Sequence, residues 1–180
     1  PTKYGLESAF VPTTGFNSTA CNTEFTLAAH SQLGLWAWRE PDVSKQLIGP
    51  QGGVPKTVRG IIVTHDGHFL VGVDDGVRVF APDLAPVRVL EIGRGAVHGI
   101  ATDHDRIYVT TCDGLLLADN WRSPNIWQVL HRGREAIETV QRRRWDDLVE
   151  LVIPGGDDGV LGIYGDEGVS ARLMASRVPV

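Results

Sequence analysis

Short runs of β-branched, aromatic and aliphatic residues alternate with turn residues along most of the chain. Between the runs stand pairs such as Asp75-Gly76 and Asp113-Gly114, in which glycine accepts the positive φ that a tight hairpin needs. The pattern predicts a protein made of short antiparallel strands. The clearest predicted strands are Ile61–Val63, Phe69–Val73, Val77–Phe80, Val87–Leu90, Ile107–Thr111, Leu115–Leu117 and Leu148–Ile153.

The chain also repeats itself at a period of about 40 residues. Val58-Arg59-Gly60-Ile61 aligns with Val97-His98-Gly99-Ile100, and the match continues through residues 76 and 114. Weaker copies extend the repeat to residues 23–175. The glycines that open a Gly-apolar-x-apolar strand are 42, 38 and 45 residues apart: Gly34, Gly76, Gly114 and Gly159. Four short strands in each unit of this length are typical of a propeller blade.

The repeat decides between two all-β architectures. We predict a propeller-like array of about four four-stranded blades, because stacked blades bury the faces that a lone sheet leaves exposed. The alternative is a single jelly-roll β-barrel or sandwich, which also fits 180 residues but does not require a repeat. We divide the chain into a non-repeating N-terminal segment, residues 1–22, as a candidate closing strand, and a propeller-like repeat domain, residues 23–180.

One stretch, Arg134–Arg144, is a candidate helix. The β-branched Thr139 and Val140 weaken that reading, and the repeat favours a strand followed by a charged turn. We interpret the nearby arginines as a solvated, charged loop. These are Arg132, Arg134, Arg142, Arg143 and Arg144.

Two motifs resemble known propeller repeats. Tyr108-Val109-Thr110-Thr111, followed by Asp113-Gly114, resembles the YVTN-type repeat. The segment Ala118–Trp127 is similar to the Asp-box turn of sialidase-like propellers, although it lacks that motif's turn glycine. The resemblance implies the propeller superfold, which hosts many unrelated activities.

Composition excludes several classes of function. The 17 Lys and Arg against 22 Asp and Glu give a net charge of -5, which argues against binding nucleic acid by neutralising phosphates. No apolar run approaches the roughly 20 residues that span a bilayer, and no signal peptide is visible, so the compartment stays open. Cys21 and Cys112 are too few for a disulfide framework.

The histidines and carboxylates do not form a recognisable metal-binding or catalytic pattern. His65-Asp66-Gly67-His68 has the look of a metal-ligand pair, but His104-Asp105 repeats the first two residues at the equivalent position. We therefore interpret His65 and His104 as turn residues and predict no metal ion and no cofactor. Most of the carboxylates stand beside hairpin glycines, and neither a Ser-His-Asp pattern nor a phosphate-binding loop occurs. No catalytic residue is predicted.

Four tryptophans are the candidate binding residues. Trp36 and Trp38 fall on one face of a strand, while Trp121 and Trp127 flank a proline-containing loop, where we expect Trp121 to be exposed. Such rings can anchor a protein partner or stack on a sugar. Packing between blades needs no ligand and is the default role of these rings.

From these observations we predict a non-enzymatic interaction or structural module that acts as a subunit of a larger assembly through protein–protein contacts. The alternatives are a capsid-type shell subunit with a β-barrel, and a propeller lectin or glycoside hydrolase completed by another chain. Tyr4, Leu6, Phe10 and Phe16 are the residues available to close the ring. If they do not close it, open sheet edges recruit partner strands. The partner's identity stays open.

Overall fold

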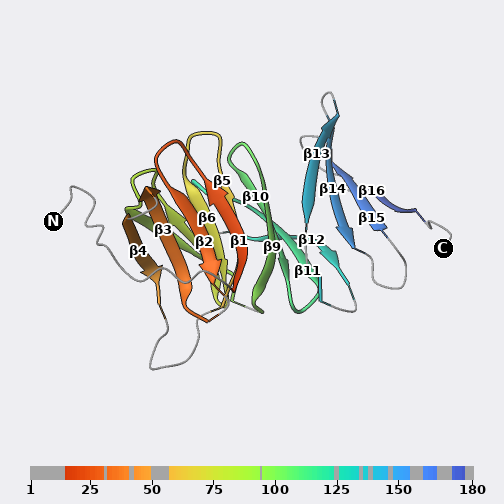
Figure 1. Cartoon of the computed structure of the whole chain (residues 1–180). Coiled ribbons are helices and arrows are strands. Elements are labelled where there is room, and N and C mark those ends of the chain that lie inside the picture. Colours follow the sequence, from red (N-terminus) through yellow and green to blue (C-terminus); the bar gives the residue numbers. More distant parts are fainter. Residues whose placement is uncertain are drawn as a thin grey trace. The chain divides into compact units, whose positions relative to one another are not determined.

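The fold was analysed in a computed structural model. It describes residues 15–30, 32–40, 43–49, 57–93, 95–123, 126–133, 136–137, 140–145, 148–154, 160–165 and 172–176. Within these ranges there is no helix, and sixteen strands form four antiparallel sheets of four strands each (Figure 1). Each sheet consists of four strands that follow one another along the chain. The prediction of an all-β, propeller-like array of four-stranded blades is confirmed.

We number the sheets blade 1 to blade 4 in chain order. Blade 1 contains β1 (Phe16–Cys21), β2 (Thr26–His30), β3 (Gly34–Glu40) and β4 (Val43–Ile48). Blade 2 contains β5 (Val58–Val63), β6 (Phe69–Val73), β7 (Gly76–Phe80) and β8 (Pro86–Glu91). Blade 3 contains β9 (Val97–Asp103), β10 (Arg106–Thr111), β11 (Leu115–Asn120) and β12 (Gln128–Arg132). Blade 4 contains β13 (Gln141–Trp145), β14 (Leu148–Pro154), β15 (Val160–Gly165) and β16 (Arg172–Ser176).

The two best copies of the repeat form two successive sheets, as the alignment of residues 58–76 with 97–114 predicts. Gly76 opens β7 in blade 2, whereas Gly114 precedes β11 in blade 3. The two glycine-led strands therefore belong to different sheets, which excludes one continuous sandwich sheet.

The glycines that mark the repeat have a steric explanation. Gly34 has φ +81°, and a Cβ built on it would lie 1.9 Å from the carbonyl oxygen of Ile48. Gly76 has φ +151°, and its Cβ would lie 2.1 Å from the carbonyl oxygen of Leu90. In both blades the first residue of the third strand lies too close to the fourth strand to carry a side chain. The two glycines occupy equivalent positions in blades 1 and 2. The number of residues between them is therefore the length of chain from one blade to the next.

The arginine-rich segment differs from its prediction. Arg142, Arg143 and Arg144 belong to β13, whose residues Gln141 to Trp145 pair with β14. The prediction of a charged loop is wrong here because backbone pairing with the neighbouring strand decides the structure, whatever the side-chain charge.

The N-terminal segment is described only from Gly15 onward. Residues 16–21 form β1, which pairs with β2 from Phe16↔His30 to Cys21↔Thr26. Residues 1–14 lie outside the described residues, and the division at residue 22 stays a prediction.

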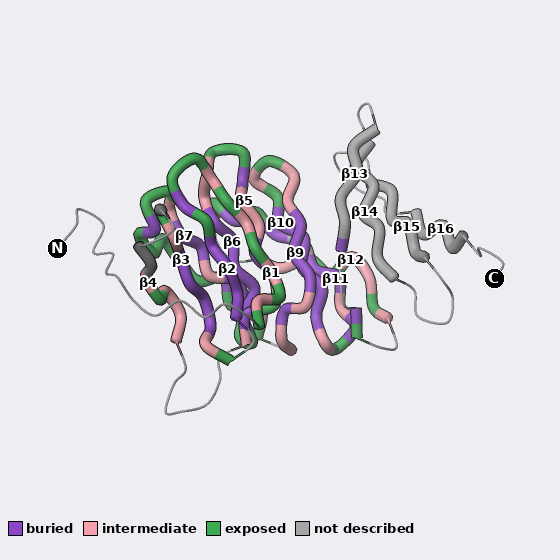
Figure 2. Tube along the Cα trace, viewed as in Figure 1, coloured by how far each residue is buried: buried purple, intermediate pink, exposed green. Residues whose placement is uncertain are grey.

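The chain divides into two compact units, Pro1–Gly93 and Arg94–Val180, and each is described by itself. In the first unit β1 and β2 lie against β5, so blades 1 and 2 pack on one another. Their shared core contains Phe25, Leu27 and Leu35 from blade 1 and Phe69 and Val71 from blade 2, all almost fully buried (Figure 2). Alternate residues of β2 and β3 supply this core, as the period of two in a strand requires.

In the second unit a smaller core joins blade 3 to the segment that leads into blade 4. Tyr108 and Leu116 of blade 3 pack in one cluster with Ile137 and Val140, and all four are buried. All residues of β10 from Ile107 to Thr111 are buried. The YVTN-like segment therefore forms an interior strand.

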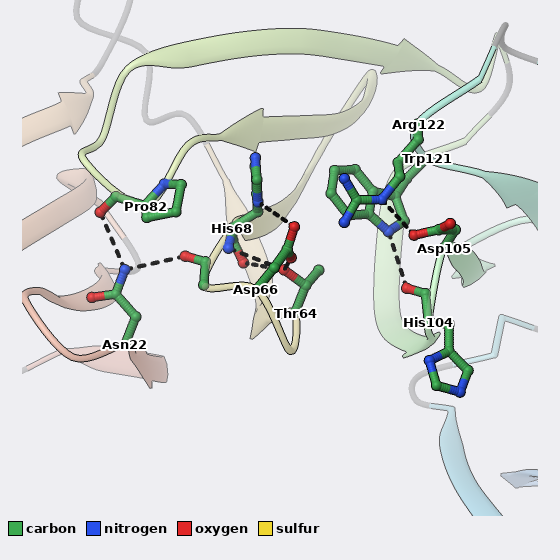
Figure 3. Close-up of polar contacts among 10 residues, drawn as sticks. Asn22, Thr64, Asp66, His68, Pro82, His104, Asp105, Trp121 and Arg122 are labelled. Carbon is green, nitrogen blue, oxygen red and sulfur yellow. Dashed lines mark hydrogen bonds and ion pairs between the residues drawn. The ribbon is translucent and has the colours of Figure 1, made fainter.

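Polar side chains of blade 1 complete the contact with blade 2. The Asn22 side-chain amide donates hydrogen bonds to the carbonyl oxygens of Gly67 and Pro82, both at 3.1 Å. Asn22 Oδ1 accepts from the backbone N–H groups of Glu24 and Phe25 at 2.9 and 2.8 Å. One side chain thus closes its own turn and binds two loops of the neighbouring blade (Figure 3).

We predict that Asn22→Ala lowers the free energy of unfolding by about 1–3 kcal/mol, because several main-chain groups lose their partner. Asn22→Asp keeps the acceptor for Glu24 and Phe25 but removes the donor, so it should destabilise the protein through the contact between blades alone. Urea titration followed by circular dichroism measures both. Thr23→Ala, at an exposed neighbour, is the control, and equal midpoints for Asn22→Ala and this control would contradict the assignment.

Candidate interaction surfaces

The first pair of tryptophans lies on the face of blade 1 that points away from the shared core. On β3, Trp36 is opposite Ala28 and Trp38 is opposite Thr26, whereas the alternate residues Leu35 and Ala37 belong to the core with blade 2. The prediction that Trp36 and Trp38 share a face is confirmed.

Two further aromatic rings join this face. The Phe16 ring meets the His30 ring edge-on at 5.4 Å and the Trp38 ring edge-on at 5.5 Å between centroids. Phe16 and Trp38 are half-buried, while His30 and Trp36 are 8% and 9% exposed. We name Phe16, His30, Trp36 and Trp38 the aromatic face of blade 1.

The second pair of tryptophans lies in blade 3. Trp121 was expected to be exposed, but its side chain is 2% exposed, so that expectation is wrong. Its indole N–H donates to the carbonyl oxygen of His104 at 3.2 Å, and the Arg122 guanidinium lies 4.2 Å from the ring centroid (Figure 3). Arg122 also pairs with Asp105. Trp121 therefore packs between a turn and its own loop, while Trp127 is half-buried.

The loop that carries Trp121 is closed by Asp119. The Asp119 side chain is buried and accepts hydrogen bonds from the backbone N–H groups of Asn120 at 2.7 Å and Ile126 at 2.9 Å. The Asn120 side chain accepts from the Arg122 N–H at 3.0 Å. Carboxylate and amide oxygens that bind nearby backbone donors are a common way to build such turns.

We predict that Trp121→Phe destabilises the protein by about 1–2 kcal/mol, because the bond to His104 is lost and the ring attracts Arg122 less strongly. Thermal or urea unfolding measures this. Ile126→Ala is the matched control, because Ile126 lies in the same loop with a side chain that is 75% exposed. An unchanged stability for Trp121→Phe would show that the indole has no structural role.

The histidine-containing turns occupy the predicted positions. His65 lies between β5 and β6, and His104 lies between β9 and β10, where it has φ +49°. In the first turn, the Thr64 hydroxyl donates to Asp66 Oδ1 at 2.6 Å, and His68 Nδ1 lies 3.1 Å from Asp66 Oδ2 (Figure 3). Both oxygens of Asp66 are thus engaged within the turn.

We predict that His65 and His68 do not share a tightly bound ion, because the carboxylate between them is already used by Thr64 and His68. Elemental analysis after incubation with zinc and gel filtration should find less than one ion per chain. Stoichiometric zinc that disappears in His65→Ala would overturn this interpretation.

One more histidine, His131, and the two cysteines complete the candidate groups. Burial lowers the pKa of His131 on β12, which favours the neutral imidazole near neutral pH. Cys21 and Cys112 are free thiols, and Cys112 Sγ accepts a hydrogen bond from the Ala96 N–H at 3.2 Å. In the described ranges, no group of three or more His, Cys, Asp or Glu side chains is placed to hold a metal ion.

Large apolar side chains are exposed on two outer strands, β8 and β12, and in the loop before β12. On β8, Val87 and Val89 are 49% and 46% exposed, and they alternate with the exposed Arg88. In blade 3, Ile126 and Val129 are 75% and 41% exposed. β8 and β12 stand last in their sheets, so in the described part of the chain no strand pairs with their outer edges. The sequence pattern showed these strands but gave no sign of which side chains would stay exposed.

The described part of the chain contains no helix with the length and hydropathy that a membrane crossing requires. No protein-family model and no curated protein sequence matches the chain.

Several solved structures are similar to the chain in fold. The computationally designed Ika4 protein matches with a TM-score of 0.62 and 15% identity, over 86% of this chain and 93% of the designed one. A chain of the Mitotic Checkpoint Complex matches with a TM-score of 0.70 and 11% identity, over 93% of this chain and 53% of that one. The extracellular domain of BT4673 from B. thetaiotaomicron matches with a TM-score of 0.71 and 14% identity, over 94% of this chain and 23% of that one.

The chain therefore spans nearly the whole of one similar protein, about half of another and less than a quarter of the third. At identities of 11–15%, these likenesses concern the fold alone. The chain is therefore similar to all three in fold.

Proposed function

We propose that this protein is a non-enzymatic interaction module that acts as a subunit of a larger assembly through protein–protein contacts. The observation that carries the proposal is the outer edge of β8, with which no strand in the described part of the chain pairs, and where Val87 and Val89 are about half exposed. An edge strand offers unpaired N–H and C=O groups to another strand, and apolar side chains beside it add contact area.

The charged residues of β8 favour pairing with a complementary partner over indiscriminate strand pairing. Arg88 stands between the two valines and Glu91 ends the strand, and both are exposed. Charges on an edge strand limit indiscriminate pairing, while the apolar face still favours a partner with complementary side chains. The exposed Ile126 and Val129 of blade 3 offer a second pair of apolar side chains.

We further propose that the loop from Ala118 to Trp127 has the structural role of an Asp-box-type turn. Asp119 supports this, because its buried carboxylate binds backbone N–H groups at the start and at the far side of the loop. In this role the loop holds β11 and β12 in register and needs no ligand.

The proposal predicts self-association that depends on the valines. At micromolar concentration the wild-type chain should sediment faster than a 19.6 kDa monomer, and Val87→Lys with Val89→Lys should shift it to the monomer. The lysines remove apolar contact and place like charges opposite one another in a paired edge. Sedimentation velocity measures the mass, and circular dichroism confirms that the variant stays folded.

Arg88→Lys is the matched control, since it keeps both the charge and the valines on the same strand. A wild-type chain that is a monodisperse monomer over the whole micromolar range would contradict assembly through β8. An oligomer that persists in the double lysine variant would place the contact elsewhere on the molecule.

A further inference from the structure

The main-chain groups of β8 alternate in direction between β7 and the outer edge of blade 2. The Ile92 N–H donates to the Asp75 carbonyl oxygen at 3.4 Å, just beyond the paired residues of the two strands. Bonded pairs recur at every second residue of an antiparallel ladder, so the next bonded pair is Leu90 with Val77. Val89 falls between bonded positions. Its N–H and C=O groups therefore point away from β7, to an edge with which no strand in the described part of the chain pairs.

The hairpin that joins β6 to β7 agrees with this alternation. Val73 and Gly76 lie opposite one another on either side of the turn Asp74-Asp75. In a β-turn the carbonyl of the first residue accepts from the N–H of the fourth, so the main-chain groups of Gly76 point toward β6. On the other side of β7, Gly76 lies opposite Glu91. That pair is therefore a non-bonded one, as is the pair that contains Val89.

Val89 also presents an exposed apolar side chain at this edge. Its side chain is 46% exposed, whereas that of the next residue, Leu90, is 1% exposed. Regular pairing ends a short way before it, because β8 has a bulge between Pro86 and Arg88, and proline has no N–H to donate. The stretch of edge that can pair with another strand is therefore short, and Val89 lies within it.

We propose that β8 pairs antiparallel with β8 of a second copy of the chain, with the two Val89 residues opposite one another at a twofold axis. The two valines exchange two main-chain hydrogen bonds, and their exposed side chains meet. The pairing joins two four-stranded blades into one continuous sheet of eight strands. A twofold axis closes the contact, so the product is a dimer and not a growing fibre. This inference rests on the proposed function, for which it names the partner and the register.

The neighbouring symmetric registers are less favourable. A pairing centred on Arg88 places two guanidinium groups directly opposite one another, and like charges in that position are destabilising. A pairing centred on Leu90 places Val89 opposite Glu91, so a carboxylate takes the place of the apolar contact. The Leu90 side chains gain nothing there, because each is already buried in its own chain. The register centred on Val89 avoids both costs.

Cysteine cross-linking in the full-length chain tests the register. Val89→Cys is made in a background with Cys21→Ser and Cys112→Ser, so that it carries the only thiol. Opposite residues of a bonded pair have Cα atoms about 5.5 Å apart, which is within the range of a disulfide. Upon oxidation, we expect the linked dimer to form at least about tenfold faster than in Thr19→Cys in the same background. Thr19 is exposed on β1 and reports random collisions.

Arg88→Cys in the same background is the matched control for the register. In the proposed dimer Leu90 of the second copy lies opposite this position, so the two new thiols are not opposite one another. We expect Arg88→Cys to cross-link as slowly as Thr19→Cys. Circular dichroism confirms that each variant stays folded, and non-reducing electrophoresis measures the linked dimer.

The outcomes separate this inference from the proposed function. Faster cross-linking of Arg88→Cys than of Val89→Cys would overturn the register. Val89→Cys could instead cross-link no faster than Thr19→Cys while the wild-type oligomer still depends on the two valines. That result would overturn the pairing of β8 with β8 and assign the contact to a different strand of the second copy, with assembly through β8 still in place. A monomeric wild-type chain would overturn both proposals.

Discussion

Phe69 and Val71 of blade 2 are shielded from water because Leu27 and Leu35 of blade 1 share their core. A four-stranded sheet has two faces, and one sheet alone cannot bury either of them. β6 is buried along its whole length, so its side chains are covered on both faces. Burial of this kind is the main favourable term in folding, and it makes each blade depend on a neighbour.

Polar side chains at the contact between blades 1 and 2 form hydrogen bonds with main-chain groups there. Where the β1 strand meets blade 2, the Ser18 hydroxyl accepts from the Ile61 N–H and the Asn17 amide donates to the Val58 carbonyl. Together with Asn22, these side chains satisfy main-chain groups of blade 2 that have no strand partner on that side. Three short polar residues in a single strand and turn therefore allow two sheets to approach closely while these backbone groups stay paired.

The dependence of each blade on packing also explains why the tryptophan and histidine residues that stand out in the sequence have structural roles. Trp121 looked like an exposed anchor, yet its ring lies between Arg122 and a turn that accepts its N–H. His65 and His104, which the repeat predicts to be turn residues, both lie in hairpin turns. The exposed apolar side chains are smaller, since those of β8 are two valines on an outer strand. In the described part of the chain, Trp121 packs inside its own blade, and no strand pairs with the outer edges of β8 and β12.

The sequence by itself determined the strands, the turns and the blade period. A period of two, Asp-Gly hairpins and the glycines Gly34 and Gly76 are local requirements of backbone geometry, so they are visible in the residue order. Tertiary structure alone decided that Arg142–Arg144 form a strand, that Trp121 is buried and that Val87 stays exposed. Each of these outcomes depends on which distant segment packs or pairs with the residue, and a local pattern carries no information about that segment.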